Sequence, residues 1–475
     1  MKILFAASEA KPFTASGGLA DVAASLPKAL KAKKQTCRIV TPLYSSVKDK
    51  WGSGLKYIGN FTVPVSWRNQ YCGLFEVNEG GTVYYFLDNE YYFGRAKLYG
   101  HYDDCERFAF FSRAVLEMLN YLNFSPDIIH CNDWQTALIP TYLKLFYKNS
   151  GIEKYSNIKT VFTIHNIQYQ GQYGYDVLED VLGIPYSAAD SVEYSGNINL
   201  MKGAIENCDR ITTVSETYAK ELTDPWYAHG LNDLIVRHSG KLTGILNGID
   251  YKQYDPANDT DIFSTFTAAD LSGKARNKER LLFELGLESR QRAPLLGMVS
   301  RLVAHKGLDL VRFSFDELIQ AGFTIAVLGT GDDEYQHFLS EMVFRYPGRV
   351  SVTLDFVPEL AKRIYAASDM FLMPSCSEPC GLAQMIALRY GTVPIVRETG
   401  GLADSIKDCF LGKGNGFTFR NYDASEMVSA VYRALEVYNN EKNWEKLVKY
   451  CMKSNLRWSK SAGEYVKVYE EITTS

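Results

Sequence analysis

Short apolar runs alternate with helical patterns along this chain, and this alternation limits the possible folds more than any other feature. Each run is bounded by polar residues or glycine, and the rhythm restarts in the second half of the chain at Pro294. Such alternation is typical of βαβ units and parallel sheets. We therefore predict an α/β protein with two successive sheets. The predicted strands include 2–7, 127–130, 160–164 and 210–214, and then 294–299, 324–328, 350–354, 370–373 and 393–396.

The length of 475 residues favours two domains. A single hydrophobic core stops growing beyond about 250–300 residues, and ligands often bind in the cleft between two domains. A polar segment from about Asn247 to Gln291 separates the two predicted sheets and includes a helix-forming run near 274–285. We predict domains over 1–246 and 247–455, a final helix within 456–475, and a cleft between the domains.

The composition excludes several classes of protein. Hydrophobic residues make up 46% and charged residues 22% of the chain, as in an average soluble protein. The net charge of −4 gives no positive field for nucleic acid, and no apolar run approaches the roughly 20 residues of a membrane span. Nine cysteines without C-x-x-C spacing fit neither a disulfide framework nor a zinc site. We expect a cytoplasmic protein that binds neither nucleic acid nor membranes.

Residues that follow predicted strands are the first candidates for a site, because ligands of open parallel sheets bind beyond the carboxyl ends of the strands. Arg301 and Lys306 follow one strand of the second half. A guanidinium fork and an ammonium together suit a diphosphate, although a solvated surface pair has the same pattern. Gly329 and Thr330 begin a small-residue loop after the next strand, where a nucleotide can approach the backbone.

The segment 374–382 is the most informative of these loops. It fixes Glu378 between prolines and places Gly381 at the start of a predicted helix. The carboxylate can accept hydrogen bonds from hydroxyl groups, and the helix start favours an anion. A Gly-Gly turn follows at 399–402. This combination predicts a site for a sugar and a phosphate.

A first Gly-Gly turn lies in the first half of the chain, where Gly17 and Gly18 precede a helical stretch. Backbone N–H groups at such a turn can bind a phosphate. A plain strand-to-helix turn has the same sequence, so this pattern leaves both interpretations open.

Two other strand ends of the first half mix acidic, amide, imidazole and aromatic side chains, as sugar sites do. Asp133 follows one strand, and His165 follows another together with Asn166 and Tyr169. We predict a functional role for His165. For His130, which lies at the end of its strand, the sequence favours a structural role.

Two other chemistries are disfavoured. The seven histidines are dispersed, and neither His-x-x-x-His nor an acidic cluster with ligand spacing occurs, so we predict no metal site. A G-x-S-x-G nucleophile elbow is also missing where the fold would need it, which argues against acyl transfer.

Taken together, these motifs resemble the bacterial glycogen synthase and plant starch synthase family over essentially the whole chain. The resemblance implies a GT-B fold, in which two Rossmann-like domains flank a cleft, with an acceptor-binding first domain and a donor-binding second domain. It also implies that the last helix crosses back to the first domain. The matching segments, in family order, are 16–22, 130–134, 162–171, 244–250, 300–307, 378–382 and 389–402.

The resemblance also implies roles for individual residues. Arg301 and Lys306 would bind the donor diphosphate, and Glu378 would hold the transferred glucose. His165 and Asp133 would lie near the reacting glucose, with acceptor contacts from Asn166 and Tyr169. The further donor-site positions that it implies are Ala15, Gly17, Gly18, Asp21, Asn247, Gly329, Thr330, Phe356, Cys380, Gly381, Leu382, Thr399, Gly400, Gly401 and Leu402.

The sequence departs from the family pattern at two places. The family commonly has Lys-Thr-Gly-Gly-Leu where this chain has Ala15-Ser16-Gly17-Gly18-Leu19, so the lysine of that loop is missing. The usual Arg-Phe before Glu-Pro-Cys-Gly is here Cys376-Ser377. Both departures remove a cation near the expected donor site.

The expected activity is transfer of glucose from ADP-glucose to the non-reducing end of an α-1,4-glucan with retention of configuration, without a cofactor or metal. The partners would be the nucleotide sugar and the glucan, and the enzyme would be a monomer or weak homo-oligomer. Two alternatives remain open at this point: a UDP-glucose-dependent or other GT-B glucosyltransferase, and an inactive glucan-binding protein.

Overall fold

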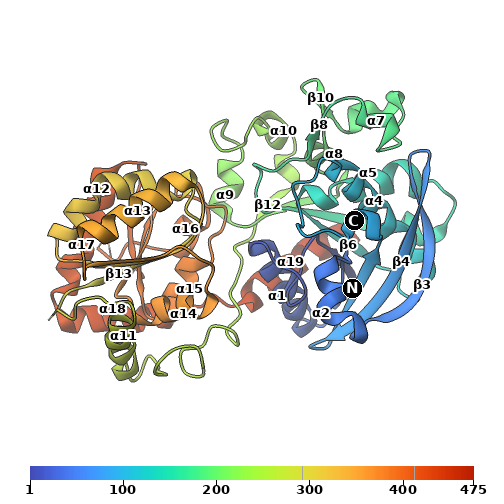
Figure 1. Ribbon diagram of the computed structural model, residues 1–475. Helices are drawn as coiled ribbons and strands as arrows, with labels where there is room; N and C mark the ends of the chain where they lie inside the picture. The colour runs from blue at the N-terminus through green and yellow to red at the C-terminus, as the bar shows by residue number, and fades with distance from the viewer. Residues whose placement is uncertain (291, 411, 475) are drawn as a thin grey trace. The chain divides into compact units, whose positions relative to one another are not determined.

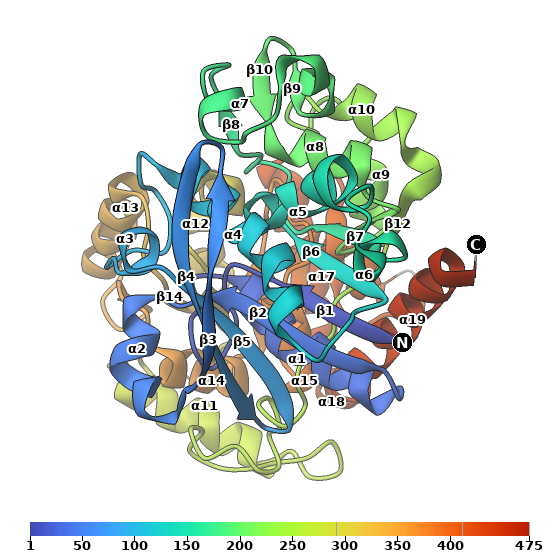
Figure 2. The same ribbon diagram turned by 90° about the vertical axis from the view of Figure 1, so that its right-hand side faces the viewer.

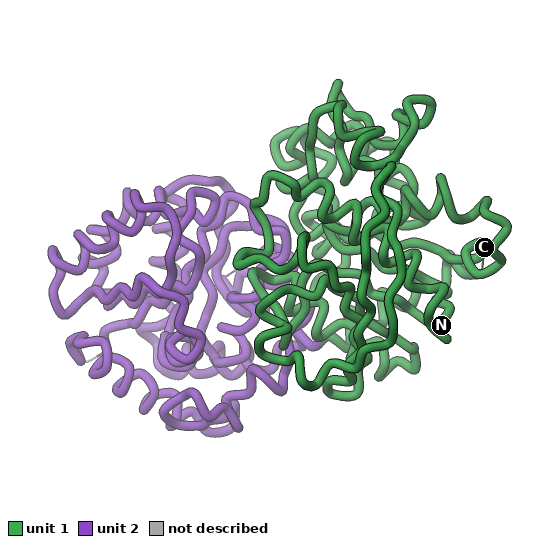
Figure 3. Tube along the Cα trace, turned by 45° about the vertical axis from the view of Figure 1, so that its right-hand side comes forward, with its two compact units in different colours: residues 1–247, 458–475 green, residues 248–457 purple. Residues whose placement is uncertain are grey.

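The computed structural model describes residues 1–290, 292–410 and 412–474. Gln291 and Ser475, which end two of the predicted segments, lie outside the described residues. The chain forms two compact units (Figure 3). Unit 1 contains residues 1–247 together with helix α19 (Trp458–Thr474), and unit 2 contains residues 248–457. The boundaries drawn from the sequence lay after 246 and after 455.

Unit 1 is built on a nine-stranded sheet in the order β12-β11-β7-β6-β1-β2-β5-β4-β3. Its strands are parallel from β12 to β5, whereas β4 and β3 are antiparallel. The strand order reverses between β1 and β6, which is where ligands of such sheets bind. The strands are β1 (Lys2–Ala6), β2 (Thr36–Pro42), β3 (Lys56–Val65), β4 (Arg68–Glu79), β5 (Thr82–Asp88), β6 (Ile128–Asn132), β7 (Lys159–Ile164), β11 (Arg210–Thr213) and β12 (Leu242–Gly244).

Helices cover both faces of this sheet. Helix α1 packs against α19, and α4, α5 and α8 form a second packed group. A small antiparallel sheet, β8-β10-β9, follows β7 along the chain. The remaining elements are α1 (Gly18–Ala32), α2 (Ser45–Trp51), α3 (Glu90–Phe93), α4 (Asp104–Glu117), α5 (Leu138–Tyr142), α6 (Glu153–Ser156), β8 (Gln172–Tyr173), α7 (Val177–Asp180), β9 (Glu193–Tyr194), β10 (Asn197–Asn199), α8 (Leu200–Asn207), α9 (Glu216–Glu221) and α10 (Asn232–Arg237).

Unit 2 contains a six-stranded, fully parallel sheet in the order β15-β14-β13-β16-β17-β18. The order reverses between β13 and β16. Most of its strand residues are buried, as expected for strands covered on both faces. The strands are β13 (Leu295–Val299), β14 (Thr324–Leu328), β15 (Val350–Thr353), β16 (Met370–Met373), β17 (Val393–Arg397) and β18 (Phe417–Phe419).

The helices of unit 2 form a layer on each side of its sheet. Figure 1 shows α12 and α13 on one side, and α11, α14 and α18 on the other. The side chains of α11 and α14 pack with those of β13 and β14 in one hydrophobic cluster. The helices are α11 (Ser272–Glu284), α12 (Leu308–Gln320), α13 (Asp333–Arg345), α14 (Pro358–Ala367), α15 (Ala383–Arg389), α16 (Gly400–Ser405), α17 (Ala424–Tyr438) and α18 (Glu441–Met452).

The antiparallel edge of unit 1 did not emerge from the sequence. The β3–β4 hairpin adds to the parallel sheet through β5 and extends along one edge of the sheet (Figure 2). In β5, Tyr84, Tyr85 and Phe86 are fully buried, so this aromatic cluster belongs to the core of unit 1. Burial of their rings, rather than ligand binding, accounts for this cluster.

Candidate active site

In unit 2, the loops that follow β13 and β16 meet where the strand order reverses. Lys306 Nζ lies 2.6 Å from Glu378 Oε2, and Ser375 Oγ donates to the same oxygen at 3.1 Å. Glu378 is 8% exposed, and within the described part of the chain its Oε1 has no hydrogen-bond partner. The structure therefore joins two predicted residues that are 72 positions apart and leaves one carboxylate oxygen available.

Two contacts hold these loops together. The N–H of Cys376 donates to His305 O at 2.9 Å. Gly307 has φ +76°, and a Cβ there would lie 2.1 Å from Pro374 O. Only glycine fits this position, because both the conformation and the space exclude a side chain. The turn after β13 is thus pressed against the turn after β16.

The Gly-Gly turn before α16 packs against the backbone of the Glu378 loop. Gly400 has φ +43°, and a Cβ there would lie 2.0 Å from Glu378 O. The N–H of Gly401 donates to Glu378 O at 3.1 Å, and a Cβ at Gly401 would lie 2.0 Å from Cys380 O. This turn therefore holds the loop that carries Glu378, and a direct ligand contact from it stays a prediction.

Most neighbours of these glycines are also buried. Thr399 and Leu402 are 0% exposed, and Cys380 is 7% exposed. Gly381 has φ +71°, and Leu382 is the N-cap residue of α15. The buried side chains of this set contribute to packing, and its backbone remains suited to the predicted donor contacts.

Arg301 is exposed, at the start of the loop that ends with Lys306. Burial lowers the pKa of His305, and the positive charges of Lys306 and Arg301 lower it further. Both cations thus act on the same imidazole. In the described residues the Arg301 side chain has no ion pair or hydrogen bond, so its guanidinium is available to an anion.

The small-residue loop after β14 lies beside the Arg301 loop. Leu302 N donates to Thr330 O at 3.0 Å, and a Cβ at Gly329 would lie 1.9 Å from Ser300 O. Gly329 is therefore required by a close backbone approach, while Thr330 is exposed. Phe356 follows β15 and is 83% exposed, and no contact in the described part of the chain links it to Lys306 or Glu378.

Arg397, at the end of β17, is a cation that the sequence analysis missed. Its Nη1 donates to Cys376 O at 2.6 Å. The guanidinium therefore reaches the loop in which Cys376-Ser377 replaces the usual Arg-Phe of the family. Its position directly after an apolar strand was the available signal.

In unit 1, Asp133 follows β6 in an unusual backbone conformation with φ 57° and ψ 179°. This region is nearly restricted to glycine and costs about 1–3 kcal/mol for other residues. Asp133 Oδ1 accepts hydrogen bonds from His165 N at 2.8 Å and Asn166 N at 3.4 Å. Burial raises the pKa of Asp133 to about 7, although these hydrogen bonds oppose the rise. The loops after β6 and β7 meet at this carboxyl group.

The imidazole of His165 is held by Asn132, the last residue of β6. His165 Nε2 lies 2.9 Å from Asn132 Oδ1, and Asn132 Nδ2 donates to Ala6 O at 2.9 Å. Because Asn132 Oδ1 is then an acceptor, Nε2 carries the proton of His165 and Nδ1 can accept. Burial lowers the pKa of His165 to about 3, so the imidazole is neutral at neutral pH.

His130 is fully buried. Its Nδ1 lies 2.7 Å from Tyr469 Oη of α19, and its Nε2 lies 2.6 Å from Thr163 Oγ1. Both ring nitrogens are occupied within the core, and the structure therefore gives His130 the structural role that the sequence favoured.

The predicted acceptor residues lie in the turn after His165. Asn166 Oδ1 accepts from Gln168 N at 3.0 Å and shapes the turn. Tyr169 is 51% exposed, so its ring is accessible. Asn247, the last residue of unit 1 before unit 2, is 5% exposed, and its buried Oδ1 has no hydrogen-bond partner in the described part of the chain. An unpartnered buried acceptor of this kind calls for an explanation, and a bound ligand supplies one.

The first Gly-Gly turn starts α1, next to the strand reversal of unit 1. Glu9, a residue that the sequence analysis missed, contacts this turn. Its Oε2 accepts hydrogen bonds from Ser16 N at 2.6 Å and from Ser16 Oγ at 2.7 Å. Burial raises the pKa of Glu9, while these hydrogen bonds lower it. Gly17 and Gly18 are exposed, and a Cβ at Gly18 would meet nothing within 4 Å.

A lysine does reach this turn, but from another position. Ala15 is exposed, whereas Lys11 Nζ lies 2.7 Å from Asp21 Oδ1 in the first turn of α1. Lys11 N also donates to Ala20 O at 3.2 Å. The loop therefore retains a cation beside α1, although residue 15 lacks one.

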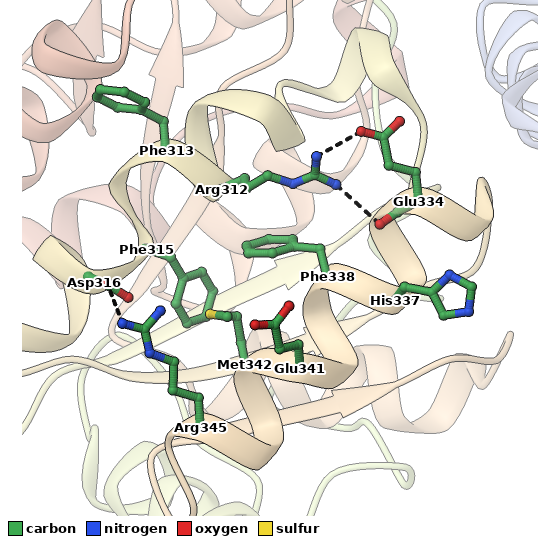
Figure 4. Close-up of a pocket in the computed structure, with 10 residues that line it drawn as sticks. All are labelled: Arg312, Phe313, Phe315, Asp316, Glu334, His337, Phe338, Glu341, Met342 and Arg345. Atoms are coloured by element: carbon green, nitrogen blue, oxygen red, sulfur yellow. Dashed lines mark hydrogen bonds and ion pairs between the residues drawn. The ribbon is translucent and has the colours of Figure 1, made fainter.

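A cavity of about 480 Å³ lies elsewhere in unit 2, between α12 and α13 (Figure 4). Its lining, in the part of the chain that the structure describes, includes none of the predicted site residues. Two ion pairs join the helices, Arg312 to Glu334 at 2.7 Å and Arg345 to Asp316 at 3.0 Å. All of its lining residues belong to α12 and α13. The cavity is therefore a groove between two helices rather than part of the candidate site.

Two further searches cover the described residues only. They contain no group of three or more His, Cys, Asp and Glu residues that could hold a metal ion. None of the helices they form is long and apolar enough to cross a membrane.

Comparisons with known proteins identify the family of this chain. The model of the starch synthase catalytic domain matches residues 2–237, and that of glycosyl transferases group 1 matches residues 284–449. The glycogen synthase of Clostridium botulinum (strain Alaska E43 / Type E3) is 46% identical over 477 residues, which cover 100% of both chains. The chain belongs to the glycogen and starch synthase family. Another member, the glycogen synthase of Clostridioides difficile (strain 630), is 46% identical over 480 residues, covering 99% of this chain and 100% of that protein.

Solved structures show the same fold. The catalytic domain of starch synthase IV from Arabidopsis thaliana, bound to ADP and acarbose, has a TM-score of 0.92 and 34% identity, covering 100% of this chain and 99% of that chain. Sucrose-phosphate synthase from Thermosynechococcus elongatus, with a TM-score of 0.61 and 15% identity, shares the fold over 100% and 99% of the two chains. The predicted GT-B fold of two Rossmann-like units is confirmed, as is the predicted enzyme class: this family member is a glycosyltransferase.

Proposed function

We propose that this glycosyltransferase is a glycogen synthase that transfers glucose from ADP-glucose to the non-reducing end of an α-1,4-glucan with retention of configuration. The observation that carries the proposal is the contact between Lys306 and Glu378 at the strand reversal of unit 2. It combines a cation for a diphosphate with a carboxylate for sugar hydroxyls. The matched glycogen synthases and the ADP in the starch synthase IV structure support this choice of substrate and donor.

On the donor side, Arg301 and Lys306 bind the diphosphate, and Glu378 holds the glucose. The open Oε1 of Glu378 accepts hydrogen bonds from sugar hydroxyls, while Lys306 and Ser375 keep Oε2 in place. In this proposal the backbone at 329–330 and 380–382 and the exposed ring of Phe356 contact the nucleotide sugar.

On the acceptor side, His165 and Asp133 orient the hydroxyl groups near the reacting carbon, and Asn166 and Tyr169 contact the glucan. The neutral imidazole of His165 offers Nδ1 as an acceptor for a hydroxyl, since Nε2 already donates to Asn132. The carboxyl of Asp133 titrates near neutral pH, which allows it to donate or accept as the sugar requires.

The reaction requires stabilisation of the leaving diphosphate. The acceptor oxygen bonds to the anomeric carbon on the face from which the diphosphate leaves, and the hydroxyl proton passes to a diphosphate oxygen. No metal is required in this proposal, because Arg301 and Lys306 supply the positive charge. A preorganised donor at a developing anion contributes roughly 3 kcal/mol, so Arg301→Ala should lower kcat roughly a hundredfold or more. An unchanged kcat would remove Arg301 from the mechanism.

The deciding experiment is incorporation of labelled glucose into glycogen, measured in parallel with ADP-glucose and UDP-glucose, with and without EDTA. We expect transfer from ADP-glucose that EDTA does not reduce, by a cytoplasmic enzyme that is monomeric or weakly oligomeric. Transfer from UDP-glucose alone would assign donor choice to the altered loops at Ala15 and Cys376-Ser377. Inactivity with both donors would favour a glucan-binding protein.

A further inference from the structure

The connection between β1 and α1 carries a lysine, Lys11, at a turn that is expected to contact the donor. Its Nζ lies 2.7 Å from Asp21 Oδ1 in the first turn of α1, and its side chain is 38% exposed. Within the described part of the chain, Asp21 is the sole partner of this ammonium group. Because an ammonium has three N–H donors, two of them remain available to an anion.

The backbone at Lys11 is held from two sides. Its N–H donates to Ala20 O at 3.2 Å, and its carbonyl oxygen accepts from Tyr84 Oη at 3.2 Å. Two residues later, the buried ring of Phe13 meets the rings of Tyr84 and Phe86 edge-on, with centroids 4.9 and 5.0 Å apart. The core thus fixes the base of the lysine side chain and Asp21 fixes its end, which lowers the entropic cost of binding a ligand.

The other charged groups at this turn are acidic. Asp21 has a side chain that is 24% exposed, and Glu9 Oε2 accepts from Ser16 N at 2.6 Å, directly before the exposed Gly-Gly turn. Among the described residues, neither carboxyl group forms an ion pair with any cation other than Lys11. A diphosphate that approaches the turn is therefore met by two carboxyl groups, and Lys11 supplies the opposing positive charge.

The alternative role of the pair between Lys11 and Asp21 is to stabilise the fold. A partly exposed ion pair contributes little to stability, because water screens both charges. The turn also has other anchors, since Glu9 binds Ser16, and the backbone of Lys11 bonds to Ala20 and Tyr84. Loss of the ammonium group should therefore leave the turn in place and affect a bound anion more than the fold.

We propose that Lys11 binds the diphosphate of the nucleotide sugar and takes the place of the lysine that the family pattern has at residue 15. This inference rests on the proposed function and adds a donor-binding residue to it. The ammonium keeps its contact with Asp21 and donates its two remaining N–H groups to phosphate oxygens. Since the contact is made both before and after the diphosphate leaves, it affects donor binding more than kcat.

The first test is Lys11→Met, which keeps the alkyl stem and removes the charge. We expect the KM for ADP-glucose to rise roughly tenfold, the effect of losing one hydrogen bond to a charged group, with kcat and the KM for glycogen unchanged. Lys48→Met is the matched control, because Lys48 of α2 lies 2.7 Å from Asp88 and its side chain is 33% exposed. The control should have the wild-type KM. Equal KM values for the two variants would overturn the inference.

The second test returns the cation to residue 15. Ala15 is exposed and directly precedes Ser16, so a lysine there belongs to the same turn. Ala15→Lys added to Lys11→Met should restore most of the lost donor affinity. Such a rescue cannot come from the ion pair with Asp21, because the double variant lacks it. A double variant as weak as Lys11→Met would contradict the idea that Lys11 replaces a lysine at residue 15.

Calorimetric titration with ADP measures the diphosphate contact without any transfer and so separates this inference from the proposed reaction. Roughly tenfold weaker ADP binding by Lys11→Met, restored by Ala15→Lys, supports the inference even if the wild type transfers no glucose to glycogen. If the wild type is active and Lys11→Met binds ADP as tightly as Lys48→Met does, the inference fails and the proposed function stands. Equal losses of ADP affinity in Lys11→Met and Lys48→Met would also overturn it, because they would indicate a general effect on the fold of unit 1.

Discussion

In the described part of the chain two Gly-Gly pairs begin helices, and they are glycine for different reasons. A Cβ at Gly400 or Gly401 would lie 2.0 Å from a backbone carbonyl oxygen. A Cβ at Gly18 would meet nothing within 4 Å, and Gly17, with φ −162°, has an extended backbone that any residue adopts. The protein's own backbone occupies the space at the second pair, whereas the space at the first pair is open.

The difference separates a structural turn from a candidate ligand contact. The pair at 400–401 holds the loop that carries Glu378. The pair at 17–18 starts the 15-residue helix α1, where exposed N–H groups and the helix dipole favour an anion. One dipeptide pattern therefore has two physical roles, and substitutions can distinguish them.

We expect the largest effect from Gly400→Ala. The methyl group must displace the carbonyl of Glu378, and alanine is strained at φ +43°. The free energy of unfolding should fall by about 3 kcal/mol or more, and transferase activity should be lost with the Glu378 loop. Urea denaturation followed by circular dichroism measures the first effect. A normal midpoint with normal activity would show that the turn is not structural.

The next largest effect is expected for Lys306→Ala, with Lys278→Ala as its control. Both lysines lie 2.6 Å from a mostly buried carboxylate, Glu378 and Asp369 respectively. Each substitution leaves a carboxylate unpaired and should cost about 2 kcal/mol of stability. Only Lys306→Ala should also lower kcat roughly a hundredfold. Equal kcat values for the two variants would mean that the Lys306 contact is purely structural.

Gly18→Ala tests the open space of the first pair and should have an intermediate effect. The folded protein accommodates the methyl group, so stability should change by less than about 1 kcal/mol. The kcat/KM for the donor should fall roughly tenfold, because the methyl group hinders close approach of a phosphate to the backbone. Gly240→Ala, where a Cβ also meets nothing within 4 Å, is the control. Identical kinetics for both variants would mean that no ligand uses this space.

The last effect depends on pH and concerns the carboxylates near the two turns. Lys306 neutralises Glu378, whereas Asp133 Oδ1 accepts only backbone hydrogen bonds. Burial raises the pKa of Asp133 to about 7, from about 3.9 in an unfolded chain. The folded state then binds more protons between these values, so this contribution to stability is lost as pH rises from about 4 to about 7. Asp133→Asn should lack this decline, which urea unfolding at pH 5 and pH 8 would reveal. Equal changes in both proteins would contradict it.

Local patterns predicted much of the fold but not all of the site. The strand 370–373 emerged with the bounds that the structure has, because its apolar run is short and sharply bounded. The β3–β4 hairpin was missed, since its two-residue turn at Ser66 and Trp67 has none of the glycine or asparagine that marks such turns. Glu9 and Arg397 were missed because their contacts, with Ser16 and with the backbone of Cys376, arise only when the loops fold.

The sequence by itself determined the α/β class, the family and the residues that follow the strands, because apolar periodicity and residue type are local properties. The tertiary structure decided which strand ends adjoin, and hence that Lys306 meets Glu378 and that His165 N meets Asp133. It also decided which Gly-Gly pair is locked and which is open. Those outcomes depend on atoms of residues that are distant in the sequence, and only folding brings these atoms to within hydrogen-bond distance or collision distance.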